Sequence, residues 1–255
     1  LLLSLTVYIL LNALMYFMQA QFIFFPVKLS DDYSFAEFPN AEEVFLSVDE
    51  ERLHALYFKV EHPKGTILYF HGNSGAVDTW AWEAEDFTKR GYNLLMPDFR
   101  AYGKSTGQID FKAFSTDAKH WYDYLRQTID PASLLLVGRS LGTGIASELA
   151  SKVAAKMLIL ETPYWTMADV AKTKMPFLAV DWLLKYNFRN DIYLAKINCP
   201  IYILHGTKDE LIPYKQAARL KKLLKNKDKF FSIPNGGHNN LAEFTDYQKA
   251  LDEII

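Results

Sequence analysis

One serine stands in a setting that suits nucleophilic attack on a carbonyl carbon. Gly138 and Gly142 flank Ser140 in the pattern G-x-S-x-G, between the apolar run SLLLVG and the helix-like stretch LGTGIASELA. A serine hydroxyl is a weak nucleophile, so it needs a base, a group that orients the base, and donors for the oxyanion. A tight strand-to-helix turn would expose the hydroxyl above a sheet. The pattern is short, and its meaning depends on the rest of the chain.

An acid and a base both follow this serine in the chain. Asp209 comes just after the apolar run YILHG, and His238 lies in the glycine-rich segment IPNGGHNNL. The order serine, acid, histidine is the order that a nucleophile elbow uses in this kind of triad. The spacing therefore predicts Ser140 as nucleophile, His238 as base and Asp209 as the acid that orients the base.

Two backbone N–H groups are candidate oxyanion donors. Leu141 follows the serine, and the segment LYFHGNSG places Asn73 directly after a buried apolar run. Such an elbow takes one donor from each of these two positions. Gly72 and Gly75 allow the backbone to approach a reacting group closely.

Other residues near these segments have alternative interpretations. Glu210 adjoins the predicted acid and is the second choice for that role. His71 and His205 each precede a glycine at the end of an apolar run, and we expect them to brace loops. Asp98 and Arg100 follow a strand but precede the serine, so we expect them to brace a loop as well.

The elements that must position these residues alternate along the chain. The runs at 43–48 and 53–60 are joined by an acidic turn and predict an antiparallel pair. Later apolar runs alternate with helical stretches, at 66–70, 92–98, 133–138, 156–161, 199–206 and 229–234. The pattern predicts an α/β fold with a mostly parallel central sheet of about eight strands and helices on both faces.

The segment 163–198 has no strand and is strongly apolar. Segments of this length carry their own helices or a function. Two interpretations remain open: a helix packed on the sheet, or a small helical lid over an apolar pocket. As a lid, its candidate pocket residues are Trp165, Phe177 and Trp182.

The first 25 residues stand apart, because the first charged residue of the chain is Lys28. Up to residue 18 three polar residues interrupt the apolar run: Ser4, Thr6 and Asn12. A bilayer-spanning helix needs about 20 mostly apolar residues, so we predict a membrane anchor at 1–25 and a catalytic domain at 26–255. A cleaved signal peptide and a buried core helix are the alternatives.

Composition excludes several classes of function. A net charge of -2 gives no electrostatic case for binding nucleic acid. The single cysteine, Cys199, excludes an intrachain disulfide and a cysteine-rich metal site. We expect neither a metal nor an organic cofactor, and the sequence leaves the oligomeric state open.

Five segments in order resemble the landmark segments of α/β-hydrolase-fold serine hydrolases: YFHGNSG, PDFRAYGKSTG, VGRSLGTGIA, LHGTKDELIP and NGGHNNL. Over about residues 22–255 the chain is most similar to the membrane-anchored α/β-hydrolase-domain group related to depalmitoylating hydrolases. The resemblance implies the same triad and oxyanion donors as the spacing. Ala101 departs from it, because the family usually has glycine there, and the N-terminal cysteine cluster of the palmitoylated relatives is absent.

The function expected from these observations is a membrane-anchored serine hydrolase. It would cleave acyl esters or thioesters of small or lipid-like substrates through an acyl-enzyme on Ser140. A peptidase or amidase with the same triad is one alternative, and a non-catalytic binding protein on the same fold is the other.

Overall fold

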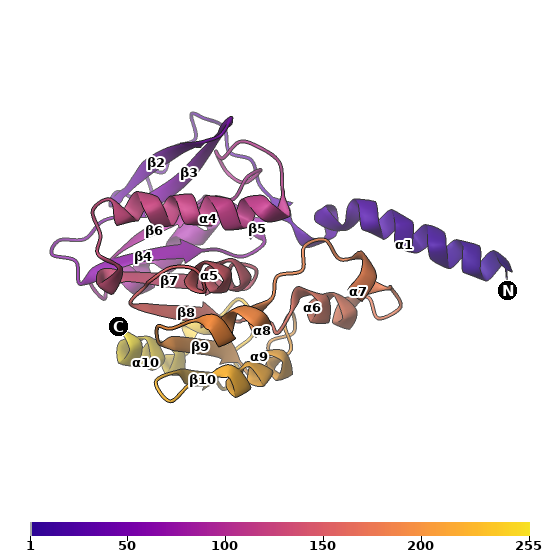
Figure 1. Cartoon of the computed structure of the whole chain (residues 1–255). Coiled ribbons are helices and arrows are strands. Elements are labelled where there is room, and N and C mark those ends of the chain that lie inside the picture. Colours follow the sequence, from indigo (N-terminus) through magenta and orange to yellow (C-terminus); the bar gives the residue numbers. More distant parts are fainter. Residues whose placement is uncertain (1) are drawn as a thin grey trace.

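Eight strands form one twisted sheet in the order β10-β9-β8-β7-β4-β6-β3-β2 (Figure 1). The structure is a computed structural model that describes residues 2–255, so Leu1, the first residue of the predicted anchor, lies outside the described residues. The strands of the sheet are β2 (Ala41–Val48), β3 (Glu51–Phe58), β4 (Gly65–Phe70), β6 (Tyr92–Pro97), β7 (Leu134–Arg139), β8 (Met157–Glu161), β9 (Ile201–Gly206) and β10 (Lys229–Ile233).

The pairing of these strands is mostly parallel. β4 pairs in parallel with both β6 and β7, and parallel pairing continues through β8 and β9 to β10. β2 and β3 form the antiparallel pair expected at the start, and β3 also runs antiparallel to β6. The predicted fold class is therefore confirmed. Every residue of β4, β6 and β7 is buried, as in strands covered on both faces.

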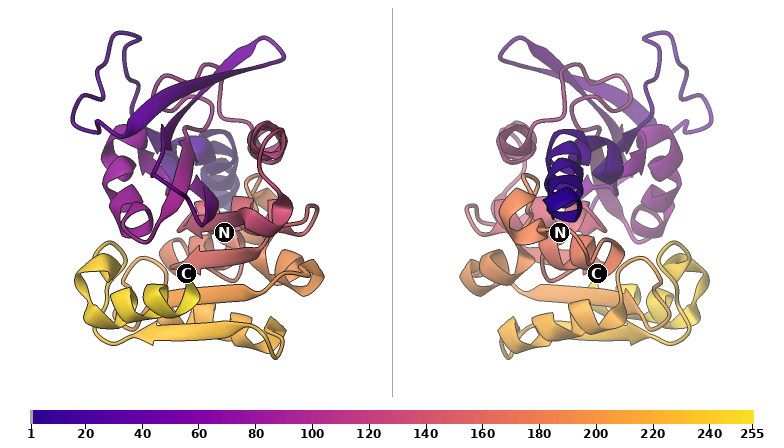
Figure 2. Two further views of the ribbon diagram at one scale, coloured as in Figure 1. Left: turned by 90° about the vertical axis from the view of Figure 1, so that its left-hand side faces the viewer. Right: turned by 90° about the vertical axis from the view of Figure 1, so that its right-hand side faces the viewer.

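Helices cover both faces of the sheet (Figure 2). Those of the main body are α2 (Val77–Trp80), α3 (Ala84–Thr88), α4 (Phe111–Arg126), α5 (Gly142–Ala150), α9 (Tyr214–Leu220) and α10 (Thr245–Ile254). Short 3-10 turns accompany them at Ala81–Glu83, Pro131–Ser133, Leu194–Lys196, Lys221–Leu223 and Leu241–Glu243. α4 and α5 pack over one face with apolar residues such as Trp121 and Ile145, and α3 and α10 pack over the other.

The N-terminal helix α1 (Leu2–Ile23) projects from this body (Figure 1). It is long and apolar enough to cross a bilayer, by length and composition. Directly after it, the short strand β1 (Phe25–Pro26) pairs in parallel with β5 (Ser74–Gly75), beside the end of β4. This two-stranded ladder joins the helix to the body.

The segment 163–198, called the insertion below, forms three short helices. These are α6 (Met167–Lys174), α7 (Val180–Leu183) and α8 (Asn190–Tyr193). α8 packs on α5, whereas α6 and α7 contact each other and lie beside α1 (Figure 1). The two ends of the insertion pack on the body, and its middle reaches out to α1.

The departure from the family pattern at Ala101 has a conformational cost. Ala101 has φ +71°, in the left-handed region that favours glycine. A Cβ in this left-handed conformation costs roughly 1–2 kcal/mol. Glycine also raises the conformational entropy of the unfolded chain, which offsets part of the gain from removing the Cβ. We therefore expect Ala101→Gly to stabilise the protein by about 1 kcal/mol. Urea denaturation in a mild detergent measures the change. The control is Ala113→Gly, inside α4, which should instead destabilise the protein by about 1 kcal/mol. A loss of stability in Ala101→Gly would contradict the explanation.

Candidate active site

The turn at Ser140 has the geometry of a nucleophile elbow. Ser140 has φ +52° between β7 and α5, a strained value for a residue other than glycine. Its N–H donates to the Glu161 carbonyl at 2.9 Å, and its carbonyl accepts the N–H of Thr143 at 3.0 Å. A Cβ at Gly142 would lie 2.0 Å from the Phe70 carbonyl oxygen, so glycine is required there. The neighbouring strands and helix thus hold the strained residue in place.

Three strand ends bring the predicted triad together. His238 Nε2 lies 2.9 Å from Ser140 Oγ, and His238 Nδ1 lies 2.8 Å from Asp209 Oδ2. Asp209 Oδ1 accepts the N–H groups of Leu211 at 2.9 Å and Ile212 at 2.7 Å, which fixes the carboxylate. All three side chains are buried. With its proton on Nδ1, the imidazole donates to Asp209 and accepts from the serine hydroxyl.

The alternative acid lies in the Asp209 loop, and one of the two expected bracing histidines lies near the end of β9. Glu210 is exposed, and its carbonyl accepts a hydrogen bond from Lys174. His205 is buried behind the carboxylate, with Nε2 3.0 Å from the Ile212 carbonyl and 3.4 Å from Asp209 Oδ2. Burial lowers the pKa of His205 despite the opposing charge of Asp209. A neutral His205 that donates to Ile212 braces the loop.

The candidate oxyanion residues face the same space as the serine. Asn73 and Leu141 both line the cavity into which Ser140 opens. The carbonyl of Asn73 accepts the N–H of Phe25 at 2.9 Å and the hydroxyl of Tyr102 at 2.7 Å. These contacts fix the peptide plane of Asn73 and hence the direction of the neighbouring backbone.

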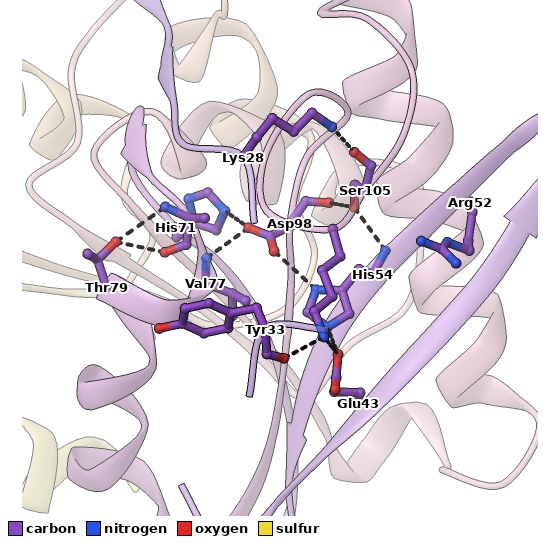
Figure 3. A network of polar contacts seen from close by, with 12 residues as sticks. Lys28, Tyr33, Glu43, Arg52, His54, His71, Val77, Thr79, Asp98 and Ser105 are labelled. Carbon is purple, nitrogen blue, oxygen red and sulfur yellow. Dashed lines mark hydrogen bonds and ion pairs between the residues drawn. The ribbon is translucent and has the colours of Figure 1, made fainter. Parts of the chain in front are cut away.

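A buried carboxylate braces the loop that leads to Asn73 (Figure 3). Asp98 Oδ2 lies 3.1 Å from His54 Nδ1, and Asp98 Oδ1 lies 3.7 Å from His71 Nε2. Asp98 Oδ1 also accepts the N–H of Val77 at 2.8 Å. Burial works to raise the pKa of Asp98, but its contacts with the two histidines outweigh burial and lower the pKa. The loop from His71 to Val77 is thus held around a charged carboxylate.

Further polar contacts surround His54 and Arg100. His54 Nε2 lies 3.1 Å from Glu43 Oε2 (Figure 3). Lys104 Nζ also reaches Glu43 Oε2, at 2.6 Å. Arg100 instead pairs with Asp117 through two contacts of 2.8 Å. Both Asp98 and Arg100 therefore lie in bracing contacts, as expected, although they brace different segments.

Behind the elbow lies a buried ionic cluster that the sequence analysis missed. Arg139, the residue before the nucleophile, pairs with Glu83 and lies 3.4 Å from the His238 carbonyl through Nη2. Glu161 is fully buried on the neighbouring strand and accepts the Tyr247 hydroxyl at 2.7 Å. Burial raises the pKa of Glu161 to about 7, although the charge of Arg139 opposes the rise.

An apolar cavity of about 370 Å³ opens beside Ser140. Its lining comes from the elbow, the Asn73 loop, the insertion, the Asp209 loop and the part of α1 from Met15 to Ile23. A cavity of this size is in the range of small-molecule sites, roughly 300–1,000 Å³. The sequence analysis missed the part played by α1, because an apolar run does not reveal what its side chains face.

The expectation that three aromatic residues of the insertion line this cavity is not met. Trp182 is 90% exposed and Phe177 is 60% exposed. Trp165 packs under the Arg219 guanidinium, 4.4 Å from the ring centroid. Smaller apolar residues line the insertion side: Met167, Val170, Ala171, Met175, Leu178, Val180, Leu183 and Leu184. Trp182 lies on the exposed side of α7, whereas Trp165 and Phe177 lie outside the helices of the insertion.

The buried Glu161 predicts a pH-dependent stability. Its ordinary pKa is 4.5 and its folded pKa is about 7, so the folded state holds an extra proton between these values and loses stability as pH rises through this window. Glu161→Gln should raise the thermal midpoint at pH 8, by the equivalent of at most roughly 3 kcal/mol, and should raise it less at pH 5.

Thermal unfolding of the full chain in detergent at both pH values measures this difference. Glu85→Gln is the matched control, because Glu85 is exposed on α3. An equal change at pH 5 and pH 8 in Glu161→Gln would show that the carboxyl does not titrate in this window.

Comparisons with known proteins agree with this fold. The family model described as alpha/beta hydrolase fold matches residues 65–182. An uncharacterized protein of Mycobacterium tuberculosis is 26% identical over 243 residues, which cover 92% of this chain and 85% of that protein. The lysophosphatidylserine lipase ABHD12 of Danio rerio is 30% identical over 187 residues, which cover 65% of this chain and 48% of the lipase.

Among solved structures, an esterase of Pyrococcus furiosus, Pf2001, has a TM-score of 0.71 at 18% identity and covers 91% of this chain and 96% of its own. A ferulic acid complex of Est1E from Butyrivibrio proteoclasticus has a TM-score of 0.69 at 19% identity and covers 83% of this chain and 97% of its own. At these identities the structural likenesses show the fold. Together with the family model, they show that the chain has the α/β-hydrolase fold.

Proposed function

We propose that the chain is a serine hydrolase that cleaves acyl esters of lipid-like substrates through an acyl-enzyme on Ser140. The observation that carries this proposal is the chain of contacts from Ser140 Oγ through His238 to Asp209, at 2.9 and 2.8 Å, beside an apolar cavity. Nucleophile, base and orienting carboxylate are thus within reach of one another and of a space for an acyl group.

The reaction runs in two steps. Ser140 Oγ attacks the acyl carbonyl carbon while His238 Nε2 takes its proton, and the N–H groups of Leu141 and Asn73 stabilise the oxyanion. His238 returns the proton to the leaving alkoxide, and the acyl group stays on the serine. Water then attacks the acyl-enzyme with His238 as base, and the free acid leaves. Asp209 keeps the imidazole in the useful tautomer and stabilises its charged form.

The cavity favours an acyl chain as the bound group. Nearly all of its lining is aliphatic or aromatic, and among the lining residues the charged one is Lys174. An apolar chain gains about 0.8 kcal/mol per buried CH₂ in such a site. The names of the relatives, a lysophosphatidylserine lipase and an esterase, agree with an ester that carries such a chain. Thioesters share this chemistry, and peptide amides fit the apolar lining less well.

We further propose that α1 anchors the protein to a membrane and stays in the mature chain. The helix is apolar, and most of its large side chains are exposed in the structure. A cleaved signal peptide would remove the residues of α1 that line the cavity. It would also remove the Ile23 carbonyl, which accepts the side-chain N–H of Asn73 at 2.7 Å.

Replacement of the nucleophile tests the proposal. Ser140→Ala should abolish labelling by a fluorophosphonate probe and lower turnover of p-nitrophenyl butyrate by about 10³-fold or more, since the covalent step is lost. Ser151→Ala is the control, because Ser151 lies at the far end of α5 and donates to the Glu148 carbonyl. Equal labelling of wild type and Ser140→Ala would refute the mechanism, and faster cleavage of peptide amides than of esters would refute the substrate class.

A further inference from the structure

The burial pattern of α1 is the reverse of an ordinary amphipathic helix. Within this apolar helix the two buried residues are Asn12 and Gln19, whereas Leu10 and Phe17 are 63% and 77% exposed. The two amides are seven residues apart, which places them on one face, two turns from each other. That face looks at the insertion.

Both amides bind the backbone at the two ends of α7. Asn12 Oδ1 accepts the N–H of Ala179 at 2.9 Å, before the first turn of α7. Gln19 Oε1 accepts the N–H of Lys185 at 2.7 Å, and its Nε2 donates to the Leu183 carbonyl at 3.1 Å. α7 has no side-chain cap of its own, so α1 supplies the partners that its ends need.

The other end of α1 is tied to the loop of the oxyanion candidate. Asn73 Nδ2 donates to the Ile23 carbonyl at 2.7 Å, and the N–H of Phe25 donates to the Asn73 carbonyl at 2.9 Å. The parallel ladder of β1 and β5 continues this contact. One helix is therefore fixed both to the insertion and to the Asn73 loop.

The cavity lies between these two attachments. α1 lines one side of it with Met15, Gln19, Phe22 and Ile23, the insertion lines the other, and Ser140 and Leu141 lie among the lining residues. The amide contacts thus hold together the two walls of an apolar space that reaches the nucleophile.

The level of these contacts along α1 places the insertion at the membrane. Asn12 is about three helical turns, or about 16 Å, from Ile23, and a bilayer core is about 30 Å thick. With α1 in a bilayer, the exposed ring of Trp182 on α7 and the exposed ring of Phe177 before α7 would face lipid. Unpaired amides and backbone N–H groups are costly in that layer, and their mutual hydrogen bonds remove the cost.

From this arrangement we infer that α1 is a wall of the acyl-chain site, and that Asn12 and Gln19 hold the insertion against it so that a lipid's acyl chain reaches Ser140 directly from the bilayer. The inference rests on the proposed esterase function and assigns its substrate an acyl chain long enough to lie between α1 and the insertion. Asn12 acts as a positioning residue, and Gln19 both positions the insertion and lines the site.

The first test loosens the contact between α1 and the insertion. In the full chain, Asn12→Leu and Gln19→Leu should each lower the ratio of kcat/KM for p-nitrophenyl palmitate to that for p-nitrophenyl butyrate about tenfold, measured in the same mixed micelles. Thr6→Val is the matched control, since the Thr6 hydroxyl donates within α1 to the Leu2 carbonyl. Its ratio should stay within about twofold of the wild type. An unchanged ratio in both leucine variants overturns the inference.

Amide hydrogen exchange shows whether those variants released the insertion. The N–H groups of Ala179 and Lys185 should exchange at least about tenfold faster in Asn12→Leu and Gln19→Leu, respectively, than in the wild type. Faster exchange together with an unchanged ratio of kcat/KM for palmitate to that for butyrate would contradict the proposed role of the contact. Fluorophosphonate labelling shows that the site of each variant is folded. A wild type that the probe does not label refutes the proposed function instead.

A second pair of variants narrows the cavity without touching the amide contacts. Met15→Trp places a large ring in the α1 wall and should lower palmitate turnover at least about tenfold more than butyrate turnover. Phe17→Trp adds the same ring on the exposed face of the helix and should leave both rates unchanged. Equal chain-length profiles in these two variants overturn the assignment of α1 as a wall.

Discussion

The strained backbone at Ser140 is the constraint on which the rest of the structure depends. A serine at φ +52° persists only where its surroundings hold it, and here β4, β8 and α5 do so. Gly142 packs directly against the carbonyl of Phe70, and the Ser140 N–H binds the end of β8. The parallel strands then bring the loops after β4, β9 and β10 to the same edge of the sheet. Nucleophile, acid, base and oxyanion candidates meet there because parallel strands end together.

The ordered polar groups behind this edge fix its loops. Asp98 holds the loop from His71 to Val77, and Asp209 is held by two backbone N–H groups of its own loop. Arg139 links the strand of the nucleophile to the loop of His238. Each of these buried charges has partners, as burial of a charge requires. The cost of burying them is offset by a site whose groups stand in position before substrate arrives.

The sequence predicted the sheet because its apolar runs are the strands. It also predicted that Ser140, Asp209 and His238 lie together, because each of them follows the end of a predicted strand. Their distances depend on tertiary packing, which spacing does not give. The residues that line the pocket are harder to predict from the sequence, because apolar character does not distinguish a residue that faces a cavity from one that faces lipid. Trp182 and Phe177 have that apolar character and are exposed. The sequence does not reveal the role of Gln19, since its partners lie more than 160 residues away in the chain.

The N-terminal helix connects the membrane proposal to the chemistry. It contributes to the cavity, to the ends of α7 and to the peptide that carries Asn73. In the proposed function, the depth of the protein in a bilayer and the shape of its acyl-chain site therefore both depend on this helix. In the proposed function, α1 is therefore both the membrane anchor and part of the active site.

The central claim is that an acyl group passes through Ser140. Rapid-quench mass spectrometry of the full chain during turnover of a long-chain p-nitrophenyl ester tests it most directly. The account predicts a mass increase equal to the acyl group on the peptide that contains Ser140, formed within the first turnover and lost as hydrolysis ends. Turnover without an acyl adduct at any time, or with the adduct on another residue, would contradict it.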